Sequence, residues 1–103
     1  MNVSKDLWSE LWVSLGSLLR SYTAAHSLHN NIHAAIEIDQ DQIVARHGER
    51  CLELMRTGAE IIWKREDGST GTLRMTPAGR LQSHEFEEEL DMAAEAWARE
   101  LMQ

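Results

Sequence analysis

Residues 42–58 decide the fold of this chain, and they read QIVARHGERCLELMRTG. Apolar and polar residues alternate here with a period of two, which is typical of half-buried strands and differs from the 3.6-residue period of a helix. Leu52 and Leu54, for example, share one side of the second half. A glycine interrupts the run, so we predict two strands, 42–47 and 51–56, joined by a short turn.

The same alternation extends outward from this stretch. Residues 32–38, 59–66 and 72–76 alternate in the same way, and turn sequences such as Asp67-Gly68 separate the runs. A parallel crossover needs about a dozen residues or more, and the connections are shorter than that. We therefore predict an antiparallel meander of about five strands.

Two amphipathic helices flank the predicted sheet. Apolar residues recur at spacings of three and four over residues 4–26 and again from Phe86 to Leu101. Ser4 and Ser83 are suited to cap these helices, and acidic residues follow each of them in the first turn. Each helix needs a surface to cover, so the sequence predicts a single α+β domain over residues 1–103, with both helices packed on one sheet face.

This order of elements resembles that of frataxin-type and secretion-chaperone-type domains. The sequence contains no motif of either group. The resemblance therefore implies a layout and no function.

Charge and composition restrict the partners. The chain has 17 acidic and 10 basic residues, and residues 83–103 alone contain seven acidic residues and one basic residue. A nucleic-acid binder usually carries a basic surface, so we expect no nucleic-acid partner. The acidic face of the C-terminal helix is typical of a solvated surface, and its alternative role is a docking site for a basic protein partner. The single cysteine excludes an internal disulfide, and no segment approaches the length of about 20 apolar residues that spans a membrane. We expect a cytoplasmic protein.

The uncovered sheet face is the candidate interface. That face should be polar if the helices cover the other one, yet every assignment of the alternating strands leaves apolar residues on it. We predict that this face or its edge strand mediates self-association, most simply as a two-fold dimer. Scattered surface hydrophobic residues are the alternative. The candidate interface residues are Val44, Cys51, Met55, Ile62 and Trp63.

The sequence predicts no catalytic, cofactor or metal site. His26, His29 and His33 have a metal-like spacing, but the predicted turn at 29–31 separates their rings. Cys51 lacks a nucleophile signature, and its place in a strand is typical of a small hydrophobic residue. The acidic stripe of the last helix, formed by Glu87, Glu88, Asp91 and Glu95, lacks the Glu-x-x-His repeat of di-iron bundles. We therefore expect a non-catalytic protein-interaction module that self-associates.

A winged-helix DNA-binding regulator is the alternative. Residues 63–80, with a Thr-Pro-x-Gly-Arg turn, resemble the wing of winged-helix regulators of the MarR type. This resemblance implies that Lys64, Arg65 and Arg74 contact phosphates. It also requires two helices upstream of the wing, within residues 42–58.

Overall fold

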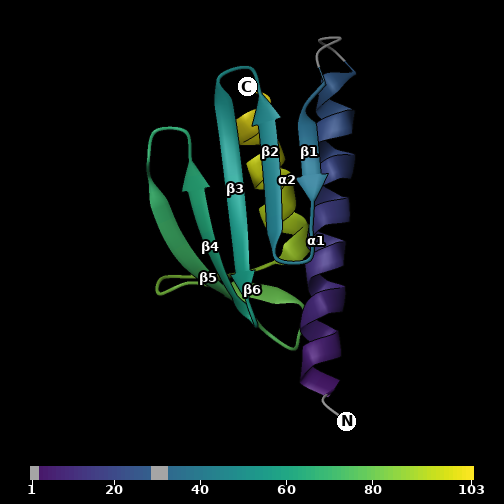
Figure 1. Cartoon of the computed structure of the whole chain (residues 1–103), viewed down its shortest axis with the longest axis vertical. Helices are drawn as coiled ribbons and strands as arrows, with labels where there is room; N and C mark the ends of the chain where they lie inside the picture. The colour runs from purple at the N-terminus through teal and green to yellow at the C-terminus, as the bar shows by residue number, and fades with distance from the viewer. Residues whose placement is uncertain (1–2, 29–32) are drawn as a thin grey trace.

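The computed structural model describes residues 3–28 and 33–103, with the side chains from residue 7 onward. Within these residues the chain forms one helix, seven strands and a second helix (Figure 1). The helices are α1 (Val3–Ser27) and α2 (Leu90–Leu101). The strands are β1 (Ala35–Ile38), β2 (Gln42–His47), β3 (Arg50–Thr57), β4 (Glu60–Arg65), β5 (Thr70–Met75), β6 (Arg80–Gln82) and β7 (Glu87–Glu89). The predicted α+β architecture is confirmed.

The strands form one antiparallel sheet in which each strand pairs with its neighbours in the sequence. Gly48 and Gly58 lie in tight turns with φ angles of 63° and 62°, a left-handed conformation that glycine adopts without steric penalty. The register aligns Ile43, Leu54 and Trp63 in one row across β2, β3 and β4. We call the face that carries this row the inner face, and the opposite face the open face.

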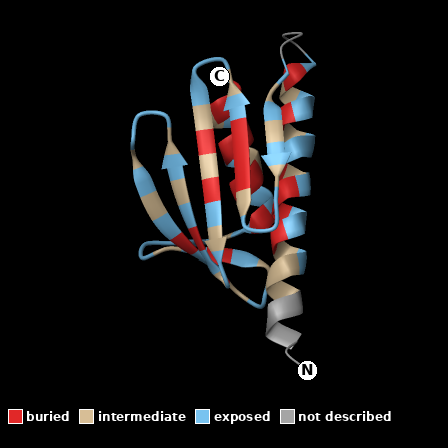
Figure 2. Cartoon of the chain, viewed as in Figure 1, coloured by how far each residue is buried: buried red, intermediate tan, exposed pale blue. Residues whose placement is uncertain are grey.

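The hydrophobic core lies between the inner face and the two helices. Figure 2 shows buried segments on β2, β3 and α2 and along one side of α1. The helices contribute Trp12, Leu15 and Leu19 from α1 and a group around Ala94 and Trp97 from α2. The buried residues of the sheet are Ile43, Ala45, Leu52, Leu54, Ile61, Leu73, Met75 and Leu81.

Specific contacts fix α1 against β1 and α2. The indole N–H of Trp12 donates a hydrogen bond to the carbonyl oxygen of Asp39, 2.9 Å away. Gly16 allows close approach, because a Cβ at this position would lie 2.9 Å from Cδ1 of Ile38. The hydroxyl of Tyr22 donates to the carboxylate of Asp91 in α2. As a result, α1 lies beside β1 (Figure 1).

Both edges of the sheet are protected. At the β1 edge, Arg20 of α1 donates from Nη2 to the carbonyl oxygen of Ile36 at 3.4 Å. The opposite edge strand, β7, has only three residues, all of them glutamates. Short, charged or covered edge strands resist pairing with another sheet.

The C-terminal third differs from the sequence prediction. The sheet has seven strands instead of about five. The two additional strands, β6 and β7, have three residues each. The last helix begins at Leu90, seven residues after the predicted cap. Ser83 forms a turn instead: its Oγ accepts hydrogen bonds from the backbone N–H groups of Glu85 and Phe86 at 3.3 and 3.2 Å. Serine favours such local turns for the same reason that it favours helix caps.

The remaining predictions about elements have clear outcomes. Helix α1 covers the range predicted for the first helix. Strands β2 and β3 occupy the stretch where a winged-helix domain needs two helices, so this chain does not have the winged-helix fold. The predicted turn at 29–31 and the predicted start of the first strand at Ile32 lie outside the described residues. Neither helix of the described chain is long and apolar enough to cross a membrane.

Candidate binding groove

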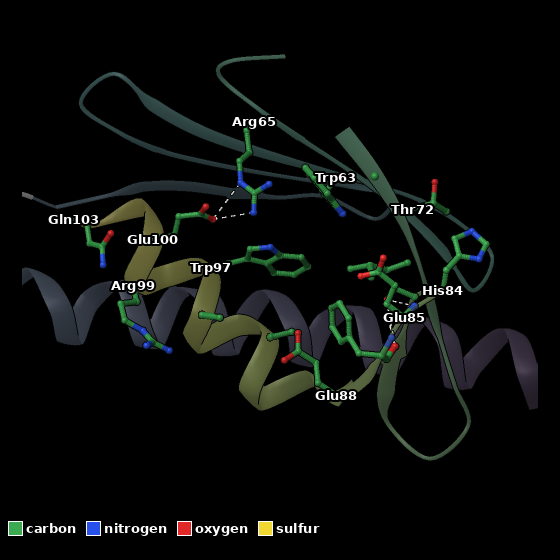
Figure 3. A pocket seen from close by; sticks show the side chains of 16 residues that line it. Trp63, Arg65, Thr72, His84, Glu85, Glu88, Trp97, Arg99, Glu100 and Gln103 are labelled. Atoms are coloured by element: carbon green, nitrogen blue, oxygen red, sulfur yellow. Dashed lines mark hydrogen bonds and ion pairs between the residues drawn. The ribbon is translucent and has the colours of Figure 1, made fainter. Parts of the chain in front are cut away.

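The helices cover only part of the inner face. Helix α2 lies behind β2 and β3, whereas β4 and β5 extend beyond it (Figure 1). The inner face of β4 and β5 therefore meets α2 and the loop 83–86 around a groove with a volume of about 700 Å³ (Figure 3). This volume lies within the range of ligand-binding clefts, roughly 300–1,000 Å³. We call it the β4–α2 groove.

Trp63 and Gly71 shape the sheet wall of the β4–α2 groove. The two residues are direct partners in the β4–β5 register. A Cβ at residue 71 would lie 2.5 Å from two carbon atoms of the Trp63 ring. The missing side chain therefore lets the indole lie over the strand backbone.

Arg65 connects the sheet wall to α2. Its guanidinium stacks over the Trp63 ring, 4.4 Å from the centroid. Its Nε and Nη2 atoms both donate to Oε2 of Glu100, at 3.2 and 3.0 Å (Figure 3). The cation–π contact and the ion pair hold the end of α2 at a fixed distance from β4.

Helix α2 supplies an apolar wall. Ala93, Ala96 and Trp97 line the groove on this side, and the small alanines leave room beside the indole. Trp97 is 9% exposed. Arg99, at the rim, is paired with Glu95 through Nε and Nη2 at 3.2 and 2.7 Å.

The loop 83–86 and β7 form the other end of the groove. Phe86 is 53% exposed, although it is aromatic. His84, Glu85 and Glu88 line the same end. The ion pairs of the described residues involve neither Glu85 nor Glu88.

The residues predicted for the interface lie on two different faces. Val44, Cys51, Met55 and Ile62 share the open face, where Met55 and Ile62 are direct cross-strand partners. These two side chains are 56% and 50% exposed. Trp63 lies on the inner face, because side chains alternate along a strand and Ile62 points outward. It therefore lines the groove and cannot share a surface with the other four.

The structure also places the residues considered for metal binding and catalysis. His33 Nδ1 lies 3.2 Å from Oγ of Ser27, and His29 lies outside the described residues. No group of three or more histidine, cysteine, aspartate or glutamate residues in the described chain is arranged to hold a metal ion. Cys51 is half-buried, and its backbone N–H donates to Oε1 of Glu66 at 2.8 Å.

The predicted acidic stripe of four residues is not a helix face. Glu87 and Glu88 belong to β7, and only Asp91 and Glu95 belong to α2. Asp91 accepts the Tyr22 hydroxyl, and this hydrogen bond raises the pKa of Tyr22 above its ordinary value of 10.0. Desolvation and the negative charges of Asp91 and Glu95 raise this pKa further.

The groove was not predicted from the sequence. One signal for it exists: Arg65 falls on the same side of its strand as Ile61 and Trp63, where an apolar residue is expected. A charged residue in such a position indicates a partner or an opening at that point of the core.

Comparison with known proteins identifies no relative of this chain. No protein-family model, curated protein or solved structure matches this chain.

Proposed function

We propose that this protein is a non-catalytic protein-interaction module and that the β4–α2 groove is its principal binding surface. The observation that carries the proposal is that Trp63, Phe86 and Trp97 converge on one groove that no element of the described chain fills. Tryptophan and other aromatic residues are enriched among the side chains that dominate binding energy at interfaces.

The anchoring of the groove walls supports binding by a preformed site. Arg65 ties β4 to α2 through Trp63 and Glu100, and the Ser83 turn fixes the loop that carries Phe86. A preformed surface loses less conformational entropy when it binds than a flexible surface does. The paired arginines thus act as structural parts of the walls.

Site-specific photo-crosslinking in cells tests this proposal. A photoreactive phenylalanine analogue at Ala96, an exposed position on the groove wall, should give a covalent adduct with another protein. The same analogue at Ala24, an exposed position of α1 outside the groove, serves as the matched control. The adduct at 96 should also decrease when Phe86 is replaced by alanine. Equal adducts at both positions, or none at 96, would contradict the proposal.

Self-association through the open face is a second candidate. The adjacent, half-exposed residues Met55 and Ile62 favour it, and Val44 and Cys51 lie on the same face. The protected edges favour this face over edge-to-edge pairing as the contact between copies. The interface between copies would then be isologous, with the same patch on both protomers.

Sedimentation velocity over a range of concentrations tests self-association. A dimer that dissociates when Ile62 is replaced by lysine, but persists when the exposed Ala24 of α1 is replaced by lysine, supports the open face. A monodisperse monomer at high concentration contradicts it.

A further inference from the structure

We infer that the β4–α2 groove accepts a cationic and apolar segment of a partner protein, with an arginine or lysine side chain placed beside Glu85 and Glu88. This inference rests on the proposed function, because it names the chemistry of the partner that the groove recognises.

The charges of the groove are unbalanced at one end. Arg65 and Arg99 are already neutralised by Glu100 and Glu95. Glu85 and Glu88 line the groove without an ion pair among the described residues, and His84 is the other titratable residue that lines this end. The loop end of the groove is therefore negative, and charge complementarity favours a cation there.

The groove also offers two indole N–H groups as hydrogen-bond donors. Trp63 and Trp97 line it, and among the described residues neither indole nitrogen is buried without a partner, so both N–H groups are open to solvent. An indole N–H can only donate, so the backbone carbonyls of a bound polypeptide are suitable acceptors for them.

The Arg65 end of the groove shows how the loop end can hold a cation. Arg65 is bound there between the face of Trp63 and the carboxylate of Glu100. The loop end offers the same two kinds of group, an exposed aromatic ring in Phe86 and the carboxylates of Glu85 and Glu88. A guanidinium or ammonium group from a partner would find a cation–π contact and a counterion together. The apolar surface between the two ends, formed by Leu73, Ala93 and Ala96, suits an aliphatic side chain next to the cation.

Titration with defined peptides tests the inference. The probe is an acetylated and amidated hexapeptide of alternating leucine and arginine, and its comparison peptide contains citrulline, which is nearly isosteric but uncharged, in place of each arginine. The readout is the indole ¹H–¹⁵N resonances of the four tryptophans. We expect the arginine peptide to shift Trp63 and Trp97 and to leave Trp8 and Trp12 unchanged, because the latter two lie on α1 outside the groove.

Matched charge variants distinguish binding in the groove from a general attraction of the cationic peptide to an acidic protein. Replacing Glu85 and Glu88 with glutamine should weaken binding of the arginine peptide about three- to tenfold, the effect of losing two exposed ion pairs. Replacing Glu60 and Glu87 with glutamine changes the net charge equally at exposed positions that do not line the groove. This control should change the affinity less than about twofold.

The possible results separate the inference from the proposed function. Equal affinity for the citrulline peptide, or equal weakening in both variants, overturns the cationic specificity. The absence of any shift at Trp63 and Trp97 overturns it as well. In each of these cases, a groove-specific adduct at residue 96 would still support the proposed interaction module. Absence of that adduct would contradict the proposed function itself.

Discussion

At the scale of single residues, Gly71 determines the form of the groove. It lies opposite Trp63, and its lack of a side chain gives the indole its place on the strand. Glycine is otherwise unfavourable within a strand, because it loses more conformational entropy on folding than alanine does.

The variant Gly71→Ala should therefore destabilise the protein. Strand preference alone would stabilise it, but the new Cβ would lie 2.5 Å from ring atoms of Trp63 and would displace the ring. We expect a loss of about 1–3 kcal/mol in the free energy of unfolding, which is typical of overpacking. Urea denaturation followed by tryptophan fluorescence measures this loss. An unchanged or increased midpoint would show that the ring has another place to lie.

Arg56 is a second residue whose role depends on its position. Its side chain is 8% exposed and makes an ion pair with Asp41 at 3.4 Å. Its Nη2 and Nη1 atoms each donate at 3.2 Å, to the carbonyl oxygens of Gln40 and Gly58 respectively. The guanidinium also lies 5.8 Å from the centroid of Trp12. It thus joins the β1–β2 loop, the β3–β4 turn and α1.

Replacing Arg56 with methionine should lower the free energy of unfolding by about 1.5–3 kcal/mol, since hydrogen bonds of a charged group are lost at a largely buried position. Arg56→Lys should recover only part of this loss, because an ammonium group cannot form the same fork of hydrogen bonds. Arg74→Met, on the exposed side of β5, is the control and should change stability by less than about 0.5 kcal/mol. Thermal and urea unfolding measure the stability of each variant. Equal losses in Arg56→Met and Arg74→Met would contradict the structural role of Arg56.

At the scale of elements, periodicity predicted the long segments and failed for the short ones. Helix α1 and strands β2 to β5 each contain enough residues for a period of 3.6 or 2 to be recognised. Strands β6 and β7 have three residues each, which is too few for alternation to appear. The sequence predicts a helix cap at Ser83 because the same residue types begin helices and turns.

The candidate site was predictable only in part for a related reason. Alternation showed that Ile62 and Trp63 lie on opposite faces, but it could not show which face the helices cover. It also could not show that α2 would leave the inner face of β4 and β5 open, since that depends on how far the sheet extends past the helix. The groove is a property of the packing of elements and has no sequence motif.

The Ser83 turn is the element whose removal should loosen the groove. In Ser83→Ala the backbone N–H groups of Glu85 and Phe86 lose their common acceptor. We expect faster hydrogen–deuterium exchange at these two amides and a loss of about 0.5–1.5 kcal/mol in unfolding free energy, the net value of a hydrogen bond. Gln82→Ala, next to it and exposed, should leave the exchange of both amides unchanged. Unchanged exchange in Ser83→Ala would mean that the loop holds its shape without the hydroxyl.

At the scale of the whole molecule, one hydrogen bond between the helices makes stability depend on pH. The Tyr22 hydroxyl donates to Asp91, which raises the pKa of Tyr22 in the folded state above its ordinary value of 10.0. A group whose pKa is raised by folding stabilises the folded state fully below its unfolded pKa. This contribution is lost as the pH rises through the folded pKa.

We therefore expect the free energy of unfolding to decrease as the pH rises above about 10, the ordinary tyrosine pKa. In Tyr22→Phe this part of the decrease should disappear. Tyr22 is the single tyrosine of the chain, so its ionisation can be followed directly by ultraviolet absorbance. A folded-state titration with the ordinary pKa would contradict the hydrogen bond to Asp91.

The order of the strands has a consequence for how the molecule folds. Because every strand pairs with its neighbour in the sequence, the sheet can assemble hairpin by hairpin through contacts of low sequence separation, which favours rapid folding. The contact between Tyr22 and Asp91 instead joins residues 69 positions apart, and closing such a long loop has a larger entropic penalty. Folding should thus have a local stage, in which the strands of the meander pair with their sequence neighbours. In a second stage, which joins distant parts of the chain, α2 docks beside α1 and forms the second wall of the groove.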